Sequence, residues 1–365
     1  MSNSNFNKDQ PYNALPDLPP KVNLETPEIF KATIKANRLL AELKGFCQTL
    51  PNPDLLLNTI VLQESKESSE IENIVTTQDE LYKATLMGDK IKNQAAKEVL
   101  QYREAMYWGL AQLSNMPIIT TNLLTGVMQK LRWTQEAVRK NTGTKLSNPI
   151  TKQIVYTPPE GEEIIRTKLA ALERFINDAE LYDIDPIIKM ALVHYQFEAI
   201  HPFSDGNGRT GRILNILYLV QQQLIGLPVL YLSKYIIENK SDYYRLLREI
   251  TEKNNWQEWI LFVANGVAET AGSTLKKIRA ILELKQEAEP QIKEALGSSY
   301  NKELVEILFS HPYIKISVLE EKGLAKRQTA SQYLQKIEAI GWLNALKIGR
   351  EVYYINDKLL NILSK

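Results

Sequence analysis

One segment, His201-Pro202-Phe203-Ser204-Asp205-Gly206-Asn207-Gly208-Arg209-Thr210-Gly211-Arg212, is the most informative part of this 365-residue sequence. A residue that precedes proline is disfavoured in the α-helical region, so the helix that contains Phe197 should end close to His201. Apolar residues recur at helical spacing from Ile213 onward, so the next helix should begin near Gly208. The segment is therefore predicted to be a glycine-bearing loop that leads from the end of one helix into the N-terminus of another.

A loop of this kind suits an anionic ligand. The first N–H groups of a helix are unpaired, and the helix dipole adds positive potential at the same end. Gly206 and Gly208 allow a ligand to approach the backbone closely. Arg209 and Arg212 are three residues apart and share a helix face, so their two guanidinium groups can bind successive phosphates of a polyphosphate.

Two further side chains of the loop provide a candidate metal ligand and a candidate base beside the predicted phosphate site. Asp205 offers a hard oxygen ligand, which suits Mg²⁺ held jointly by one carboxylate and the phosphates. His201 is the one group there whose ordinary pKa lies near neutrality, so it is the candidate base. A base, a metal ligand and a phosphate clamp together indicate phosphoryl or nucleotidyl transfer.

The loop resembles the signature of the Fic family, HPFx(D/E)GNGRxxR, at every specified position. The resemblance covers about residues 95–270 and the N-terminal helices, and it implies a mainly α-helical bundle with a β-hairpin flap. In that family the histidine deprotonates a target hydroxyl, the acidic residue binds Mg²⁺, the asparagine and glycine amides hold the α-phosphate, and the arginines hold the β- and γ-phosphates. By position these are His201, Asp205, Asn207 with Gly206 and Gly208, then Arg209 and Arg212, and Thr210 and Gly211 complete the predicted phosphate-binding segment.

The resemblance also implies a reaction. The related Doc kinases depart from the signature in its second glycine and arginine region, and this sequence does not. Transfer of AMP from ATP to a Ser, Thr or Tyr hydroxyl of a target protein is therefore favoured over transfer of phosphate. Removal of AMP, or another nucleotidyl transfer by the same site, stays open.

Two segments that flank the loop resemble further parts of Fic proteins. The residues Thr142–Tyr156 look like the flap that pairs with an extended segment of the target protein, although an ordinary surface hairpin has the same pattern. Tyr235 and Asn239 lie in a segment similar to the one that lines the adenine pocket. An aromatic residue four positions from an asparagine is equally typical of plain helix packing.

The segment Ser68–Asn73 fits the inhibitory pattern (S/T)xxxE(G/N) that Fic proteins carry on a helix beside the nucleotide site. Alone the pattern is weak, because a solvated acidic helix face often contains it. Upstream of an intact Fic loop, it implies that Glu72 pairs with Arg212 and removes the clamp for the γ-phosphate. We therefore expect an enzyme that inhibits itself at rest.

Proline and glycine residues mark boundaries between the predicted segments of the chain. Four prolines in the first twenty residues predict an extended arm, and Gly45 is expected to close the first helix. The predicted parts are an arm (1–25), N-terminal helices with the inhibitory motif (26–94), a Fic catalytic core (95–272), a helical linker (273–299) and a winged helix-turn-helix domain (300–365).

The last of these parts supports a rival function. Its third predicted helix, Ala325–Ile340, opens with Lys326, Arg327 and Gln328, and a hairpin wing is predicted around Ile348-Gly349-Arg350. A DNA-binding transcriptional regulator is therefore the alternative to an enzyme. Residues 301–365 contain ten Lys and Arg against seven Asp and Glu, which is a modest excess for DNA binding. Winged helices also dock proteins or dimerise, and related Fic proteins often form homodimers.

The composition excludes several classes of protein. The formal charge of +1 argues against chain-wide attraction to nucleic acid or membrane. Cys47 is the only cysteine, so an internal disulfide framework or a Cys-rich zinc site cannot form. The first residues lack the pattern of a secretory signal, and no apolar run approaches about 18 residues, so we expect a cytoplasmic protein without a membrane span.

Overall fold

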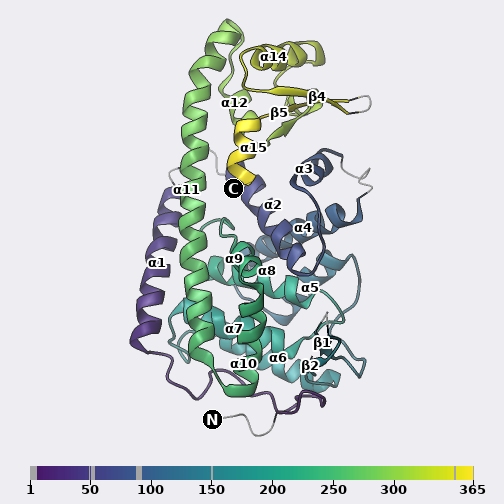
Figure 1. Ribbon diagram of the computed structural model, residues 1–365, viewed down its shortest axis with the longest axis vertical. Coiled ribbons are helices and arrows are strands. Elements are labelled where there is room, and N and C mark those ends of the chain that lie inside the picture. The colour runs from purple at the N-terminus through teal and green to yellow at the C-terminus, as the bar shows by residue number, and fades with distance from the viewer. Residues whose placement is uncertain are drawn as a thin grey trace.

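A computed structural model describes residues 6–48, 50, 54–87, 93–148, 151–348 and 351–364. The molecule is elongated, with a helical body and a smaller C-terminal module at one end (Figure 1). The centre of the body is formed by α7 (Pro186–Ile200) and α8 (Asn207–Gln221), whose side chains are buried almost all round. Because these two helices are covered by other elements on every side, they form the centre of the core.

Other helices surround this central pair. They are α1 (Pro27–Gln48), α2 (Asp54–Ile71), α3 (Gln78–Met87), α4 (Gln94–Asn115), α5 (Thr121–Arg132), α6 (Glu162–Asn177), α9 (Leu232–Glu238) and α10 (Lys240–Lys253). Gly45 does not close α1, which continues to Gln48. The expectation was wrong because Cys47 keeps the spacing of the buried residues Leu40 and Leu43 and is buried with them. Burial of that face outweighs the cost of about 1 kcal/mol of a glycine in a helix.

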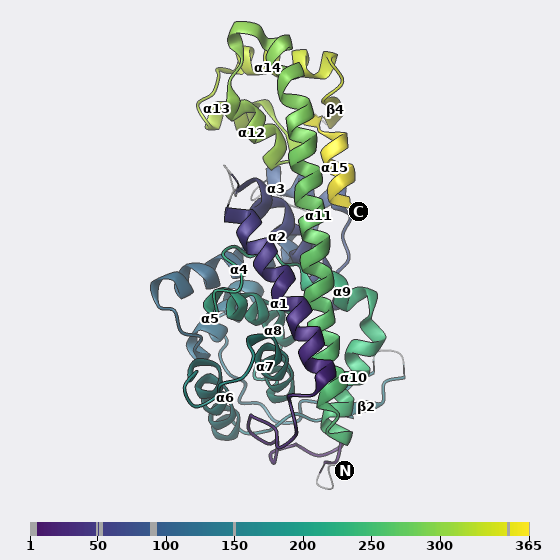
Figure 2. The same cartoon turned by 90° about the vertical axis from the view of Figure 1, so that its left-hand side faces the viewer.

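The longest element, α11 (Trp256–Leu296), joins the body to the C-terminal module. Its 41 residues correspond to a length of about 60 Å. In both Figure 1 and Figure 2, α1 lies alongside it. The boundary between core and linker that the sequence analysis placed at residue 272 falls inside this helix. Residues beyond it, including Leu275, Ile278 and Ile281, are as buried as those before it, so no separate linker begins there.

The C-terminal module follows a short 3-10 turn at Gly297–Ser299. It contains α12 (Lys302–Ser310), β3 (Tyr313–Ile314), α13 (Ile316–Glu321), α14 (Arg327–Ala339), β4 (Asn344–Ile348), β5 (Glu351–Ile355) and α15 (Asp357–Ser364). The strands form an antiparallel sheet in the order β3-β5-β4, in which Tyr354 pairs with both Ile314 and Ala345. Three helices and a hairpin thus occur in the predicted order, while β3 and α15 were not predicted. Gly349 and Arg350 of the predicted wing lie outside the described residues.

The C-terminal module is anchored on α2 and α3, which precede the catalytic core, and on α11, which follows it. Near the end of α15, the carbonyl of Leu363 accepts hydrogen bonds from Gln63 of α2 and Lys277 of α11. The Tyr313 ring stacks on Tyr82 of α3 at 5.7 Å, and its hydroxyl donates to Asp79 at 2.5 Å. The helices on both sides of Glu72 therefore contact this module.

The predicted hairpin is present as β1 (Leu146–Ser147) and β2 (Ile154–Tyr156), which pair antiparallel. Residues 149 and 150, which include Pro149 of the predicted flap, lie outside the described residues. The N-terminal arm has no regular structure from residue 6 to residue 26, yet Tyr12 and Leu15 are buried in the body.

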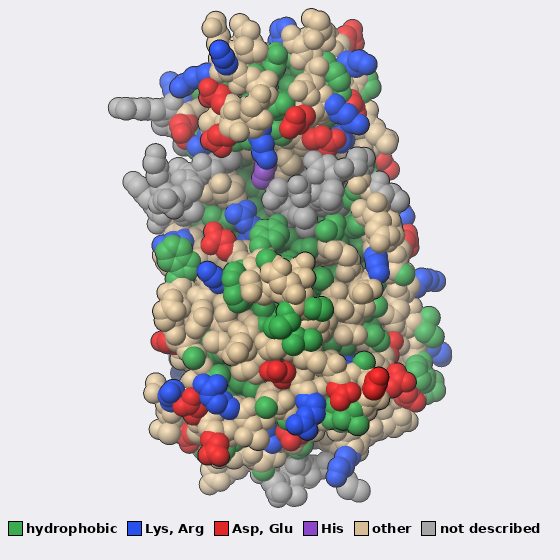
Figure 3. Space-filling model, turned by 180° about the vertical axis from the view of Figure 1, so that it is seen from behind, with side chains coloured by type: hydrophobic (Ala, Val, Ile, Leu, Met, Phe, Trp, Pro, Cys, Tyr) green, Lys and Arg blue, Asp and Glu red, His purple; other side chains and the backbone are tan. Residues whose placement is uncertain are grey.

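The surface agrees with the small net charge. On the face seen in Figure 3, basic and acidic side chains are interspersed over the body and the C-terminal module. Within the described ranges, none of the helices combines the length and the apolar character that a membrane span requires.

Candidate active site

The loop between α7 and α8 has the backbone that its sequence predicts. His201 ends α7 with a left-handed conformation (φ 50°), and Gly206 precedes α8 with φ 82°, a value that favours glycine. Between them, the buried Asn207 side chain accepts from the N–H of Phe203 (2.9 Å) and donates to its carbonyl (2.8 Å). Asn207 therefore closes the loop and fixes its shape, in addition to the phosphate contact that the family resemblance gives it.

A residue that sequence reasoning missed, Arg139, holds the end of α7. Its backbone N–H donates to the Pro202 carbonyl (2.9 Å), and its Nε donates to the His201 carbonyl (2.7 Å). Its Nη2 donates to the carbonyls of Pro159 and Ile200. A cation at a helix C-terminus is stabilised by the helix dipole. Arg139 thereby fixes the backbone that carries His201.

The imidazole of His201 is set up to accept a proton. Burial, and then the positive charge of Arg139, lower the pKa of His201 to about 4. Nδ1 is buried and has no hydrogen-bond partner among the described residues. The ring is therefore neutral at pH 7, as a base has to be.

At the N-terminus of α8, the Glu72 carboxylate lies directly against the backbone of Gly208. A Cβ at position 208 would lie 2.4 Å from Glu72 Oε1 and 3.1 Å from Arg212 Nη1. Only a glycine permits this approach. A carboxylate oxygen thus lies where unpaired N–H groups and an arginine attract an anion, which is the place that a phosphate oxygen is expected to take.

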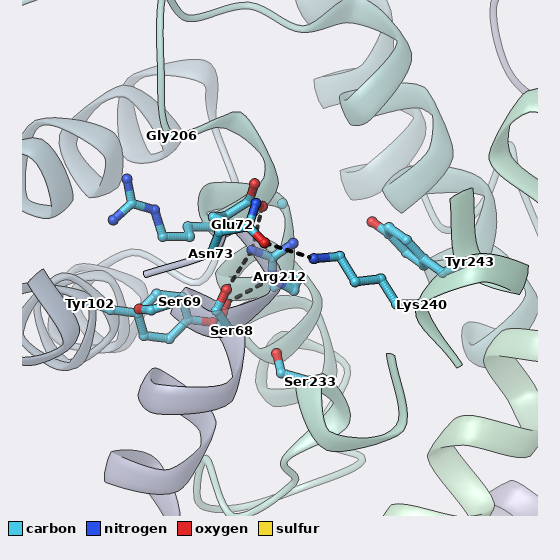
Figure 4. Close-up of polar contacts among 12 residues, drawn as sticks. Ser68, Ser69, Glu72, Asn73, Tyr102, Gly206, Arg212, Ser233, Lys240 and Tyr243 are labelled. Carbon is cyan, nitrogen blue, oxygen red and sulfur yellow. Dashed lines mark hydrogen bonds and ion pairs between the residues drawn. The ribbon is translucent and has the colours of Figure 1, made fainter. Parts of the chain in front are cut away.

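The predicted pair between Glu72 and Arg212 is present (Figure 4). Arg212 Nη2 lies 2.7 Å from Glu72 Oε1 and also donates to the Ser68 carbonyl at 2.9 Å, while Nε donates to Ser68 Oγ at 2.7 Å. Burial alone would lower the pKa of Arg212, but the carboxylate beside it raises that pKa above its usual value. The first residue of the inhibitory pattern, Ser68, and its glutamate, Glu72, thus both bind one guanidinium group.

The second arginine takes part in a chain of alternating charges. Arg209 Nη1 lies 3.3 Å from Glu98, which lies 4.0 Å from Arg132, and Arg132 lies 2.8 Å from Asp205. Glu98 and Arg132 were not found from the sequence, because they come from α4 and α5. The side chain of Asp205 is 58% exposed.

The exposure and the chemistry of Asp205 fit Mg²⁺. Its Oδ1 already accepts from the Gly206 N–H at 2.6 Å, so the carboxylate is oriented by the loop. The described residues contain no group of three side chains that could hold a metal by themselves. Mg²⁺ takes one or two carboxylates and draws its other ligands from water and substrate phosphates, so Asp205 could serve as its protein ligand.

Thr210 and Gly211 make contacts within the helical body. Thr210 is fully buried, and its N–H is bonded to the Gly206 carbonyl. A Cβ at position 211 would lie 2.5 Å from Oε1 of Glu198 and 3.1 Å from the Phe197 ring, so this glycine lets α8 approach α7. Gly211 thus allows the two helices to approach each other, and the phosphate-binding role of both residues stays a prediction.

Tyr235 and Asn239 make contacts within the helical body. The Tyr235 ring packs on Phe262 of α11 at 5.0 Å, and the Asn239 amide donates to the Tyr235 carbonyl at 2.9 Å. These are the contacts of the alternative, plain helix packing, and the adenine role stays a prediction. Nearby, Lys240 reaches Asn73 of the inhibitory pattern at 3.5 Å (Figure 4).

Three family models match successive parts of this chain. "Fic/DOC family N-terminal" matches residues 30–111, "Fic/DOC family" matches residues 124–219, and "Protein adenylyltransferase SoFic-like, C-terminal domain" matches residues 284–359. The chain belongs to the Fic/DOC family. The resemblance inferred from the loop is therefore confirmed. The N-terminal helices are matched by the Fic/DOC N-terminal model, and the C-terminal module is matched by the SoFic-like C-terminal model.

Curated relatives resemble this Fic protein over part of their length. Protein adenylyltransferase fic-1 of Caenorhabditis elegans is 31% identical over 106 residues, which are 29% of this chain and 20% of that protein. Protein adenylyltransferase Fic of Drosophila melanogaster is 30% identical over 112 residues, 31% of this chain and 21% of that protein. The match thus spans about a fifth of these relatives.

Solved structures of Fic proteins share the fold. A Fic family protein from Desulfovibrio desulfuricans G20 superposes with a TM-score of 0.59 at 17% identity, covering 93% of this chain and 98% of that one. A Fic domain containing signaling protein from Bacteroides thetaiotaomicron superposes with a TM-score of 0.53 at 18% identity, covering 68% of this chain and 96% of that one. The mainly α-helical Fic architecture is therefore confirmed.

Proposed function

We propose that this Fic protein is a protein adenylyltransferase that moves AMP from ATP to a hydroxyl group of a target protein. The target oxygen attacks the α-phosphorus of ATP, the bond to the β-phosphate breaks, and pyrophosphate leaves. The hydroxyl proton passes to the neutral imidazole of His201. One observation carries the proposal: a base with a lowered pKa ends α7 six residues before an anion-binding helix N-terminus.

Each remaining part of the loop has a place in this reaction. The N–H groups at Gly206, Asn207 and Gly208 hold the α-phosphate, and Arg209 and Arg212 hold the β- and γ-phosphates. Asp205 would hold Mg²⁺, and the bound ion would supply positive charge beside the phosphates. Catalysis then consists mainly of positioning and charge stabilisation.

The site is proposed to be inhibited at rest. Glu72 binds Arg212 and lies against Gly208, so the γ-phosphate cannot take its productive place while this carboxylate remains there. ATP is then held in a pose that does not expose the α-phosphorus to the target hydroxyl. The relatives named protein adenylyltransferase support the activity, and the observed ion pair supports the inhibition.

The reaction is tested with two labels. The Glu72→Gly variant is incubated with a bacterial lysate and either α-³²P-ATP or γ-³²P-ATP. Label on protein from the α-position alone is the expected result, and His201→Ala in the same background is the control. Label from the γ-position indicates a kinase. Loss of AMP from prelabelled protein, without any labelling, indicates removal as the main activity.

The rival proposal, DNA binding by the C-terminal module, has one supporting observation. The start of α14 exposes Lys326, Arg327 and Gln328, the positions at which a recognition helix contacts DNA. Binding to duplex DNA that weakens steeply with salt would support it. A salt-independent contact with protein would favour a docking role for this module.

A further inference from the structure

The N-terminal arm lies against the flap. The Tyr12 N–H donates to the Thr157 carbonyl at 3.0 Å, and Thr157 Oγ1 donates to the Lys8 carbonyl at 2.6 Å. Lys8 Nζ donates to the carbonyl of Ile154 in β2 at 3.2 Å. The arm therefore binds the carbonyls of Ile154 and Thr157, at the two ends of β2.

An aromatic cluster fastens the same contact. The Phe6 ring stacks on Tyr156 at 5.8 Å and meets Tyr12 edge-on at 5.2 Å, and Tyr12 meets Tyr156 edge-on at 6.4 Å. Edge-on and stacked rings at these separations attract beyond simple burial. Tyr156 is thus held between two rings of the arm.

The far end of Tyr156 reaches the helix that carries the base. Its hydroxyl donates to the Ala199 carbonyl at 2.9 Å, two residues before His201. Just beyond β2, the Pro159 carbonyl accepts from Arg139, the side chain that also binds the His201 carbonyl. Contacts therefore connect the arm to β2, and β2 to the end of α7.

We propose that arm residues 6–12 are an integral part of the target-docking surface, and that Tyr156 is a positioning residue that sets the flap relative to His201. Because the arm is bonded at both ends of β2, we place the extended, hydroxyl-bearing segment of a target protein at β1, the other strand of the flap. In the described part of the chain the flap sheet consists of β1 and β2. The inference rests on the proposed adenylyl transfer.

Hydrogen–deuterium exchange tests the contact between arm and flap without any activity. In Phe6→Ala, backbone amides of residues 143–148 and 151–157 should exchange about tenfold faster, because the Tyr156 ring loses its stacked partner. Tyr156→Phe keeps the ring, so it should release the amides of the α7 end near His201 more than those of the arm. Lys168→Ala is the matched control, because it removes the arm's ion pair at Asp17 (3.0 Å), which lies beyond the arm residues that bind the flap.

Labelling from α-³²P-ATP in the Glu72→Gly background tests the docking role. Phe6→Ala and Tyr156→Phe should each lower transfer to lysate proteins several-fold while the Kd for ATP is unchanged, and Lys168→Ala should lower neither. Unchanged flap exchange in Phe6→Ala overturns the arm contact. Faster exchange with unchanged transfer overturns the docking role. If the Glu72→Gly parent labels nothing, adenylyl transfer fails, and the exchange result still decides whether the arm holds the flap.

Discussion

Replacement of Glu72 by glycine is the perturbation that separates self-inhibition from an ordinary surface ion pair. Glu72 lies just after α2, binds Arg212 at 2.7 Å and touches the backbone of Gly208. Glu72→Gly removes the carboxylate and leaves Arg212 with its two bonds to Ser68. The γ-phosphate can then bind the guanidinium group, and transfer should accelerate.

The size of the effect follows from burial. Two unit charges about 4 Å apart attract by about 4 kcal/mol at an effective dielectric constant near 20. The Arg212 side chain is 2% exposed, but that of Glu72 is 35% exposed, so solvent screens part of this attraction. A coupling of about 1–3 kcal/mol remains, which corresponds to an increase in rate of about 5- to 150-fold.

The assay is the initial rate of AMP transfer from α-³²P-ATP, with Glu70→Gly as the matched control. Glu70 is two residues away and pairs with Lys66 at 2.9 Å, so its removal changes the same helix end without freeing Arg212. Combining Glu72→Gly with Arg212→Ala should abolish the gain, because both changes act through one guanidinium group. Equal rates for Glu72→Gly and Glu70→Gly would refute the reasoning and leave the segment as an acidic helix face.

Three further predictions concern the loop. His201→Ala should abolish transfer and leave the Kd for ATP unchanged. Because the pKa of His201 is lowered to about 4, kcat/KM of the parent should be flat from about pH 6 to pH 8. It should fall only at lower pH, where the imidazole gains a proton. A midpoint near pH 6.5 would contradict the lowered pKa. Asp205→Ala should raise the Mg²⁺ concentration needed for half-maximal transfer, and an unchanged Mg²⁺ titration would remove Asp205 as the ligand. Gly208→Ala should displace Glu72 but should not activate transfer, because the added Cβ fills the place of a phosphate oxygen. Isothermal titration calorimetry should show weaker ATP binding to this variant. ATP binding as tight as that of the parent would contradict the assigned site.

The parts of the site that could be predicted are those encoded by local sequence. Pro202 and Gly206 fix the end of α7 and the start of α8 through their own backbone preferences, so the loop was found to within a residue or two. The pair of Glu72 with Arg212 joins residues 140 apart, and it was found only because the family pattern links the two segments.

Contacts that no local pattern encodes were missed. Arg139 reaches His201 across 62 residues, and its sequence surroundings resemble any polar loop. Glu98 and Arg132 lie on α4 and α5. The apolar spacing of these helices predicts that they pack against the body, but it does not identify the ionic partners of the two residues. The continuous α11 was missed for a related reason. Its charged surface after residue 272 looked like a linker, whereas its buried stripe continues and contacts α12, α14 and α15.

The two arginines show why a phosphate site of this kind is easily inhibited from within. Buried guanidinium groups need anionic partners, since an unpaired buried charge is costly. Here Arg212 is paired with Glu72 and Arg209 with Glu98. A carboxylate offers negatively charged oxygens, as a phosphate does, so a nearby glutamate can pair with these arginines when no nucleotide is bound. In the proposed mechanism, binding of ATP phosphates and inhibition by Glu72 therefore both depend on one property, the burial of Arg212 beside the N-terminus of α8.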